Sequence, residues 1–327
     1  MSTSELKILV VGRNGQISRD LQTLLPSIGS VDCVGRPEVD LTQPDNVRQA
    51  IRDRRPDVLI NAAAYTAVDQ AESEPEQAMK INAEAPAIMA EEAKRLGSLF
   101  ISYSSDYVFD GQKAGPYTEE DEPNPLSVYG ASKLAGDRAI QAIDGSHLIF
   151  RTSWVYSVNG KNFLKTILKL ATERDELRIV DDQIGAPTWS RDIASATVQV
   201  IRSLVQEQEV AGSKNGQWVE VLDTKRGLYN LTSSGNVSWY GFAGTITNQV
   251  KRMGRESQKV ARISAIPTRE YPTTARRPLN SRLSNQKIKK AFGISLPPWE
   301  ESMLRTLETM FSANKFQQQQ PPLRTKG

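Results

Sequence analysis

The sequence predicts an α/β fold in which a doubly wound parallel sheet carries a smaller, mixed α/β lobe. In the first half, short unbroken apolar runs alternate with amphipathic stretches of helical period. Continuous apolar runs are typical of strands buried on both faces, as in parallel sheets that are covered by helices. Right-handed crossovers between such strands place helices on both faces of the sheet.

The individual elements follow in order along the chain. Apolar runs predict strands at 6–12, 31–35, 57–63, 99–105 and 147–153. Helical periodicity predicts helices at 18–29, 44–54 and 76–96 and around Tyr129. After residue 155 the pattern loosens into helices at 161–174 and 190–205 and short strands at 227–232 and 260–266.

The chain therefore divides into two unequal parts and a tail. We expect residues 1–155 to form mainly the sheet domain and residues 156–312 mainly the smaller lobe, with some exchange of chain between the two. The polar, turn-rich stretch 207–227 is expected to be an exposed excursion. Residues 313–327 are poor in apolar side chains, which predicts a disordered tail.

Composition narrows the class of protein. Hydrophobic residues make up 39% and charged residues 24% of the 327, and the net charge is +3, so nothing calls for nucleic acid as a partner. With one cysteine, Cys33, and one histidine, His147, an internal disulfide and a Cys/His metal cluster are excluded. No signal peptide or bilayer-spanning run is visible, which predicts a cytoplasmic protein without a membrane partner.

A glycine loop follows the first predicted strand. In "VVGRNGQIS", Gly12 and Gly15 stand between this strand and the first helix. Glycine permits close backbone approach, and the helix N-terminus offers free N–H groups to a pyrophosphate. A tight turn alone would also need glycine, but the position in the first βα unit favours a dinucleotide. Ser18 occupies the place of the third glycine of this fingerprint.

The end of the second strand bears on which dinucleotide is used. An acidic residue there would hold the ribose hydroxyls of NAD, whereas arginine would pair with the 2′-phosphate of NADP. Here the strand ends in "VGRPEVD", with Gly35 and Arg36 where a carboxylate would stand. We therefore predict NADPH, held through Arg36 and Arg13, with NADH as the alternative.

Three residues at the same sheet edge suggest proton transfer. Ser105 ends the fourth strand, and Tyr129 and Lys133 lie four residues apart on the next helix, hence on one face. Hydride addition to a ketone leaves an alkoxide that must be protonated. Tyr129 could donate that proton, Lys133 could lower the phenol pKa from about 10, and Ser105 could hold the carbonyl oxygen. The competing interpretation is that Tyr129 and Lys133 are ordinary solvated surface residues. It is disfavoured because the glycine loop and Ser105 are expected at the same edge of the sheet.

Five segments carry a resemblance to a known family. They are "NAAAYTAVDQAESEPEQA", "YSSDYVFDG", "PLSVYGASKLAGD", "FRTSWVY" and "ARRPLNSRLS", spread from residue 61 to residue 284. In this order they resemble the dTDP-4-dehydrorhamnose reductase family of the extended short-chain dehydrogenase/reductase superfamily. The resemblance implies a Rossmann-type fold and NAD(P)H-dependent reduction of the C4 ketone of dTDP-4-dehydro-6-deoxy-L-mannose to dTDP-L-rhamnose, with Tyr129 and Lys133 as the catalytic pair.

The resemblance also assigns roles to further residues. Ser105 takes a place where the family often has threonine. Contacts to the sugar nucleotide fall on Asp106 and Trp154, with Tyr107 beside them, and Arg276 and Arg277 are candidates for its diphosphate or are solvated loop charges. Contacts to the cofactor fall on Gln16, Ile17, Asp40, Leu41, Ala64, Tyr65, Thr66 and Tyr103. Some members use Mg²⁺ and form homodimers, but we find no clear ligand set for a metal here.

Two other functions stay open. A non-catalytic, NADP-binding regulatory subunit resembling that of methionine adenosyltransferase would keep the fold, although it would not need Ser105, Tyr129 and Lys133. Another sugar-nucleotide reductase, an epimerase or a dehydratase of the same superfamily is the second alternative. A dehydratase would want a glutamate after Asp106, and "SSDYVFDG" has none. Simple reduction is therefore favoured.

Overall fold

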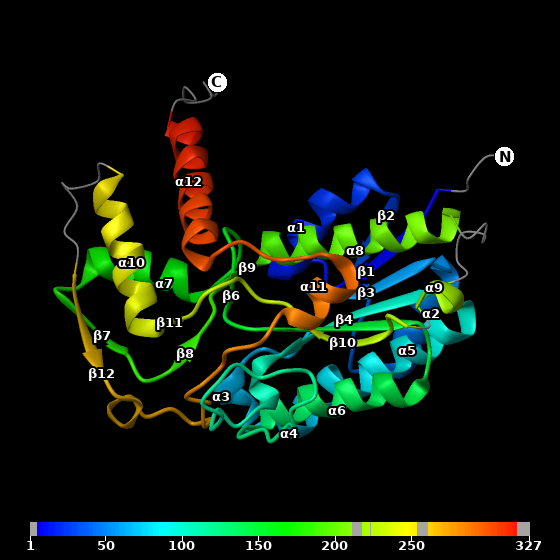
Figure 1. Ribbon diagram of the computed structural model, residues 1–327, viewed down its shortest axis with the longest axis horizontal. Coiled ribbons are helices and arrows are strands. Elements are labelled where there is room, and N and C mark those ends of the chain that lie inside the picture. The colour runs from blue at the N-terminus through cyan, green and yellow to red at the C-terminus, as the bar shows by residue number, and fades with distance from the viewer. Residues whose placement is uncertain (1–4, 211–217, 223, 254–260, 319–327) are drawn as a thin grey trace, which may run out of the picture.

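The computed structural model describes residues 5–210, 218–222, 224–253 and 261–318, and a six-stranded parallel sheet forms its centre (Figure 1). The strands run in the order β10-β5-β4-β3-β1-β2. Their bounds are β1 Lys7–Val11, β2 Ser30–Val34, β3 Val58–Asn61, β4 Leu99–Ser105, β5 His147–Thr152 and β10 Gly227–Asn230. The chain order reverses between β1 and β3, which is where doubly wound sheets bind their ligands.

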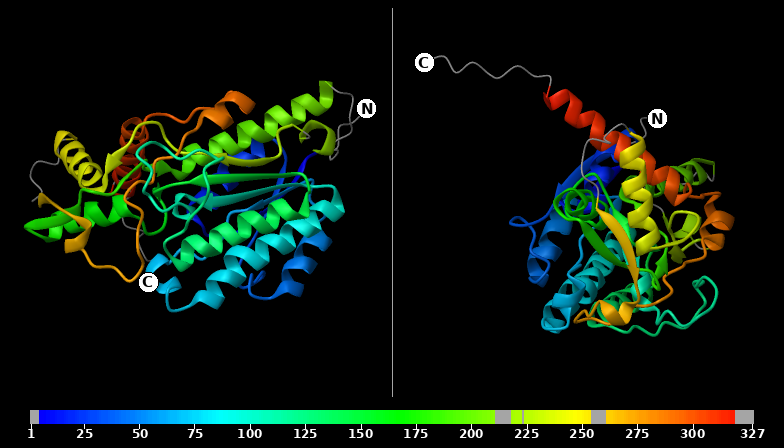
Figure 2. Two further views of the ribbon diagram at one scale, coloured as in Figure 1. Left: turned by 60° about the horizontal axis from the view of Figure 1, so that its bottom comes forward. Right: turned by 90° about the vertical axis from the view of Figure 1, so that its left-hand side faces the viewer.

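Helices cover both faces of this sheet, as predicted. One face carries α1 (Gln16–Leu24), α8 (Ser190–Val210), α9 (Trp218–Leu222) and α11 (Gln286–Phe292). The other carries α2 (Pro44–Arg54), α5 (Ala85–Leu96) and α6 (Val128–Ile143), and Figure 2 shows α5 and α6 side by side there. Because β1, β3, β4 and β5 are sandwiched between the two layers, their apolar side chains are almost wholly buried. This explains the unbroken apolar runs in the sequence.

The predicted helix at 76–96 is built from three pieces. It comprises α4 (Pro75–Met79), a π-helical turn at Lys80–Glu84 and α5, and the short α3 (Val68–Ala71) precedes it. Turns of π-helix widen a helix locally and are frequent at functional sites. This one carries Asn82, which is buried and faces the loop after β3.

A smaller lobe lies beyond one end of the sheet (Figure 1). Its core joins α7 (Phe163–Glu173), α10 (Trp239–Arg252) and α12 (Trp299–Gln318). Three two-stranded pairs complete it: β6 (Val155–Tyr156) with β9 (Thr188–Trp189), β7 (Glu176–Val180) with β12 (Arg262–Ile266), and β8 (Ile184–Gly185) with β11 (Val237–Ser238).

The chain crosses between the two parts more than once. The segment expected as a lobe strand at 227–232 contributes β10 to the edge of the main sheet, where it pairs with β5. Likewise, α8 packs on α1 and belongs to the sheet domain. The local pattern at 227–232 could predict a strand. It could not predict which sheet the strand joins, because its pairing with β5 depends on residues far away in the sequence.

Two expectations about exposed segments need correction. The stretch 207–227 is exposed only in part where the structure describes it: Val210 is 90% exposed, but Trp218 is wholly buried and donates from Nε1 to the Asp57 carbonyl oxygen at 2.8 Å. The tail begins later than expected, since α12 continues to Gln318. Residues 319–327 of the expected disordered tail lie outside the described residues.

Candidate active site

A cavity of about 830 Å³ opens at the carboxyl ends of the strands, between the sheet and the lobe. Most of the residues expected from the sequence line it: Gly12, Gly15, Gln16, Ile17, Arg36, Asp40, Leu41, Ala64, Thr66, Tyr103, Ser105, Asp106, Tyr107, Tyr129, Lys133 and Trp154. Tyr65 and Arg276 are not among the lining residues. One cavity thus gathers the glycine loop, the end of β2, the Ser-Tyr-Lys group and the start of the lobe.

The glycine loop brings the start of α1 to the wall of the cavity. Gly12 has a φ of +115°, and a Cβ there would lie 2.8 Å from the backbone carbon of Ala62. Only glycine therefore fits at this position, because the backbone at Ala62 lies so close and the φ is positive. Gly15 precedes α1 without a side-chain cap, and the first turn of α1 holds no acidic residue. The N–H groups of this turn are consequently open to an anion.

Ser18 stands in for the missing third glycine without disturbing the packing. It is fully buried, and its Oγ lies 3.5 Å from the Cys33 Sγ. The small side chain lets α1 approach β2, which is the role of glycine at this place.

Beyond β2 the cavity wall is basic, but one of its arginines is already paired. Arg36 is exposed at the wall. Arg13 donates from Nε to the Cys33 carbonyl oxygen at 2.8 Å and from NH2 to Glu38 Oε2 at 2.7 Å. Glu38 also pairs with Arg54. The position that commonly carries a carboxylate is thus occupied by Gly35 and Arg36, whereas Arg13, which comes from the glycine loop, is held by the later carboxylate of Glu38.

The two remaining cofactor segments are held by local hydrogen bonds. Asp40 accepts from the Thr42 N–H and hydroxyl at 2.9 Å, and these bonds lower the pKa of its carboxyl. The loop after β3 is fixed by Asn82, which accepts from Tyr65 N at 2.8 Å and donates to Tyr65 O at 3.0 Å. The Tyr65 hydroxyl turns to Glu74, so any contact of Tyr65 with a ligand would come from its backbone.

Tyr129 and Lys133 lie on the first turns of α6, facing the end of β4. Ser127 caps this helix by accepting from the Gly130 N–H at 3.2 Å. Gly130 is needed because a Cβ there would stand 2.2 Å from the Tyr107 carbonyl oxygen. Lys133 is buried and its Nζ donates to the Tyr103 carbonyl oxygen at 2.7 Å. The Tyr103 hydroxyl, in contrast, bonds Thr197 on the far side of the sheet.

The ionisation of Tyr129 differs from the prediction. Burial raises the pKa of Tyr129 to about 12, the Ser105 hydroxyl offsets part of this, and the charges of Asp106 and Asp137 add to it. Burial also lowers the pKa of Lys133. Lys133 is not among the groups that act on the phenol, so the expected lowering of its pKa is not seen, and burial and two carboxylates act in the opposite direction. Tyr129 is a neutral phenol at neutral pH.

Asp106 is a buried carboxylate, and one of its two oxygens accepts no hydrogen bond from the described residues. It is 2% exposed, its Oδ1 accepts from the Ser105 hydroxyl at 3.1 Å, and its Oδ2 has no hydrogen-bond partner in the described part of the chain. Burial raises the pKa of its carboxyl to about 7, although the hydroxyls of Ser281 and Ser105 act to lower it. Tyr107 follows, with its ring edge-on to Tyr129 at 5.5 Å between centroids. A buried carboxylate oxygen without a partner at a cavity wall suits a ligand hydroxyl.

Trp154 reaches the cavity from the loop after β5. Its backbone has a φ of +47°, and its indole stacks on Trp239 at the start of α10, with centroids 3.5 Å apart and planes 7° apart. Gly185 makes room for the ring, since a Cβ there would lie 2.5 Å from it. Trp239 was not predicted; "VSWYGF" reads as an ordinary helix start, and no local signal brings it to Trp154.

The two arginines proposed for a diphosphate lie differently. Arg276 is exposed and does not line the cavity. Arg277 pairs with Asp69 at 2.7 Å, and Asp69 also accepts from Ala275 N at 3.0 Å. A ligand would have to compete with Asp69 for Arg277.

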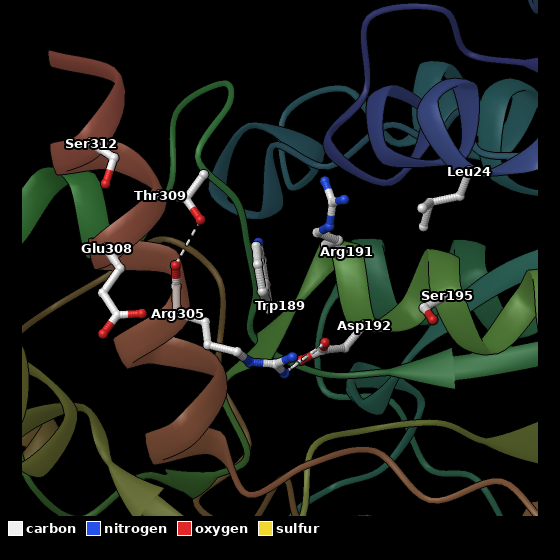
Figure 3. Close-up of a pocket in the computed structure, with 9 residues that line it drawn as sticks. All are labelled: Leu24, Trp189, Arg191, Asp192, Ser195, Arg305, Glu308, Thr309 and Ser312. Carbon is white, nitrogen blue, oxygen red and sulfur yellow. Dashed lines mark hydrogen bonds and ion pairs between the residues drawn. The ribbon is translucent and has the colours of Figure 1, made fainter. Parts of the chain in front are cut away.

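A second, more open hollow of about 720 Å³ lies elsewhere, between α8 and α12 (Figure 3). Arg305 from α12 pairs there with Asp192 on α8. None of the predicted site residues lines it. Within the described residues no three His, Cys, Asp or Glu side chains gather as a metal site, and no helix is long and apolar enough to cross a membrane. His147 is buried, with Nδ1 2.9 Å from the Gly145 carbonyl oxygen.

The doubly wound sheet, the glycine loop at its switch point and the Ser-Tyr-Lys group beside it define an oxidoreductase of the extended short-chain dehydrogenase/reductase class. Comparison with known proteins identifies the family within this class. The family model described as RmlD substrate binding domain matches residues 6–312, and on this evidence the chain belongs to the dTDP-4-dehydrorhamnose reductase family.

Curated relatives and solved structures agree. The dTDP-4-dehydrorhamnose reductase of Burkholderia thailandensis is 45% identical over 295 residues, 90% of this chain and 95% of the relative. That of Escherichia coli is 41% identical over 315 residues, covering 94% and 99%. The crystal structure of the Bacillus anthracis reductase in complex with NADP matches with a TM-score of 0.80 at 30% identity, covering 93% and 99%.

Proposed function

We propose that this chain reduces the C4 ketone of dTDP-4-dehydro-6-deoxy-L-mannose to dTDP-L-rhamnose, with NADPH as the hydride source and Tyr129 as the proton donor. The observation that carries the proposal is the meeting of Ser105, Tyr129 and Lys133 with the open N-terminus of α1 at one cavity. The names of the relatives supply the substrate.

The residues present fit a dinucleotide. The uncapped first turn of α1 suits a pyrophosphate, and the loop 64–66, held by Asn82, would flank it. Arg36, and Arg13 if it leaves Glu38, would bind a 2′-phosphate. Bound NADPH supplies the hydride.

Each side chain then has a defined task. Ser105 directs the substrate carbonyl oxygen. Tyr129 gives its hydroxyl proton to that oxygen as the alkoxide forms, so the ketone gains one hydride and one proton and becomes an alcohol. The raised pKa of Tyr129 keeps the donor protonated at neutral pH. Asp106 accepts a hydrogen bond from a sugar hydroxyl, and Trp154 packs against the sugar face.

The test is NADPH oxidation upon addition of the keto sugar nucleotide, with the product identified by mass spectrometry and NMR. We expect dTDP-L-rhamnose, and a loss of turnover of about 10² or more in Tyr129→Phe with nearly intact NADPH binding. NADPH binding without oxidation would contradict the proposal and point to a regulatory subunit. Conversion of the sugar without net oxidation of NADPH would point to an epimerase.

A further inference from the structure

A buried ion pair, Asp137–Arg151, lies one helical turn after Lys133. Asp137 follows Lys133 by four residues on α6, and Arg151 projects from β5. Both are 3% exposed, and the Arg151 Nε donates to Asp137 Oδ2 at 3.1 Å. Tyr129, Lys133 and Asp137 are spaced by four residues each, so they share one face of the helix. The row runs from the cavity wall into the interior.

This pair is poorly explained as a stabilising element. Removing two charges from water costs several kcal/mol per ion, and well-packed apolar residues commonly serve as well or better. The Arg151 guanidinium lies 5.1 Å from the centroid of the Phe109 ring, yet its NH1 has no hydrogen-bond partner within the described residues. An incompletely satisfied arginine in the core suggests that the charge itself is needed.

The charges of this row act on one another in sequence. Burial disfavours the Lys133 ammonium, and the Asp137 carboxylate is the charge that opposes this by raising the pKa of Lys133. Burial likewise disfavours the Asp137 carboxylate, and Arg151 is the largest opposing influence, followed by Lys133. Asp106, after β4, is the other carboxylate that acts on Tyr129. Asp106 and Asp137 are thus the charges that act on Tyr129, and Asp137 is the one that acts on Lys133. Glu72 lies at the start of the same helix, where it accepts from the Val128 N–H at 2.8 Å.

We propose that Asp137 is a positioning residue that keeps Lys133 protonated and directed to the cavity, and that Arg151 keeps Asp137 ionised and in place. Tyr103 O fixes one N–H of Lys133, and Asp137 supplies the countercharge that the buried ammonium otherwise lacks. The inference rests on the proposed function, because Tyr129, the proton donor there, shares its helix face with Lys133.

Asp137→Asn tests this through the pH profile of kcat/KM for the keto sugar. Loss of the carboxylate removes the negative charge that raises the pKa of both Lys133 and Tyr129, so both pKa values should fall. The alkaline limb should therefore move down by about one pH unit or more. Activity at pH 6 should stay within about threefold of wild type, and the loss should exceed about tenfold on the alkaline limb.

Two further variants separate charge from structure. Asp137→Glu retains the charge and should restore the alkaline limb. Asp192→Asn removes another buried carboxylate, paired with Arg305 and Ser302 away from the cavity, and should leave the limb in place. An equal loss at every pH in Asp137→Asn, or wild-type activity throughout, would overturn the proposal.

If Asp137→Asn does not fold, or if the keto sugar is not reduced at all, wild-type protein still decides the matter. The ¹³Cε resonance of Lys133, assigned by its absence in Lys133→Arg, reports protonation directly. A Lys133 resonance that stays in its protonated form over the whole pH range in which the protein is folded supports Asp137 as the countercharge, and deprotonation at neutral pH overturns it. This readout needs no substrate, so it distinguishes failure of this inference from failure of the proposed reaction.

Discussion

Trp154 and Trp239 stack almost face to face although they come from different parts of the molecule, one from the end of the sheet and one from the lobe. Their contact closes one wall of the cavity. It also holds Trp154 in a left-handed backbone conformation that is uncommon outside glycine. The lobe therefore forms part of the cavity wall through this aromatic pair, together with Gly160, Lys161 and Asn162.

Loss of Trp239 should weaken binding of the sugar nucleotide and spare the dinucleotide. Aromatic pairs contribute about 0.5–1.5 kcal/mol beyond burial, so KM for the sugar nucleotide should rise roughly three- to tenfold in Trp239→Ala. Trp239→Phe keeps a ring and should stay close to wild type. Steady-state kinetics and a titration with NADPH check this; an unchanged KM in Trp239→Ala would show that the stack does not shape the site.

Choice of cofactor should depend on Glu38, which ties up Arg13. Glu38→Gln frees the guanidinium for a 2′-phosphate, and the ratio of kcat/KM for NADPH over NADH should rise about three- to tenfold, a modest change because Arg13 and Glu38 are each roughly 40% exposed. Asp32→Asn is the matched control, since it loosens Arg54 and leaves the Arg13–Glu38 pair intact. Equal ratios in Glu38→Gln and wild type would contradict this role.

The buried carboxylate of Asp106 should lower the stability of the fold at alkaline pH while contributing to binding of the sugar nucleotide. Its folded pKa of about 7 lies above the value of 3.8 in the unfolded chain, so the folded form binds the proton more tightly. This contribution to the free energy of unfolding is present below pH 4 and is lost as pH rises towards 7. Asp106→Asn should raise the free energy of unfolding at pH 8 by about 1–3 kcal/mol, and KM for the sugar nucleotide should increase about tenfold.

Urea unfolding at pH 5 and pH 8 measures this effect. Asp110→Asn serves as the control of opposite sign. Hydrogen bonds from Gln112 N and Tyr117 lower the pKa of Asp110, so its contribution is present above pH 4 and is lost as pH falls through the folded pKa. That variant should therefore be destabilised at pH 8. A stability of Asp106→Asn that does not change with pH relative to wild type would refute the assignment.

Much of this site could be read from the sequence because its signals are local. The glycine loop, Ser105 and the Tyr129–Lys133 spacing each sit at a strand or helix end that periodicity locates, and parallel strands bring such ends together. Trp239 and the partner strand of β10 could not be predicted, since both depend on contacts far apart in sequence. Arg276 shows the converse: its motif was visible, but its side chain lies away from the cavity.

Gly130 should matter more than its size suggests, because it lets α6 touch the segment that follows β4. A Cβ there would meet the Tyr107 carbonyl oxygen at 2.2 Å, and backbone cannot move aside without shifting Tyr129 relative to Ser105. Gly130→Ala should cost about 1–3 kcal/mol in urea unfolding and most of the activity. Gly244→Ala, in α10, has no atom within 4 Å and should instead stabilise by about 0.5–1 kcal/mol. If Gly130→Ala behaves like Gly244→Ala, the close approach of α6 to Tyr107 is not what aligns the two hydroxyls.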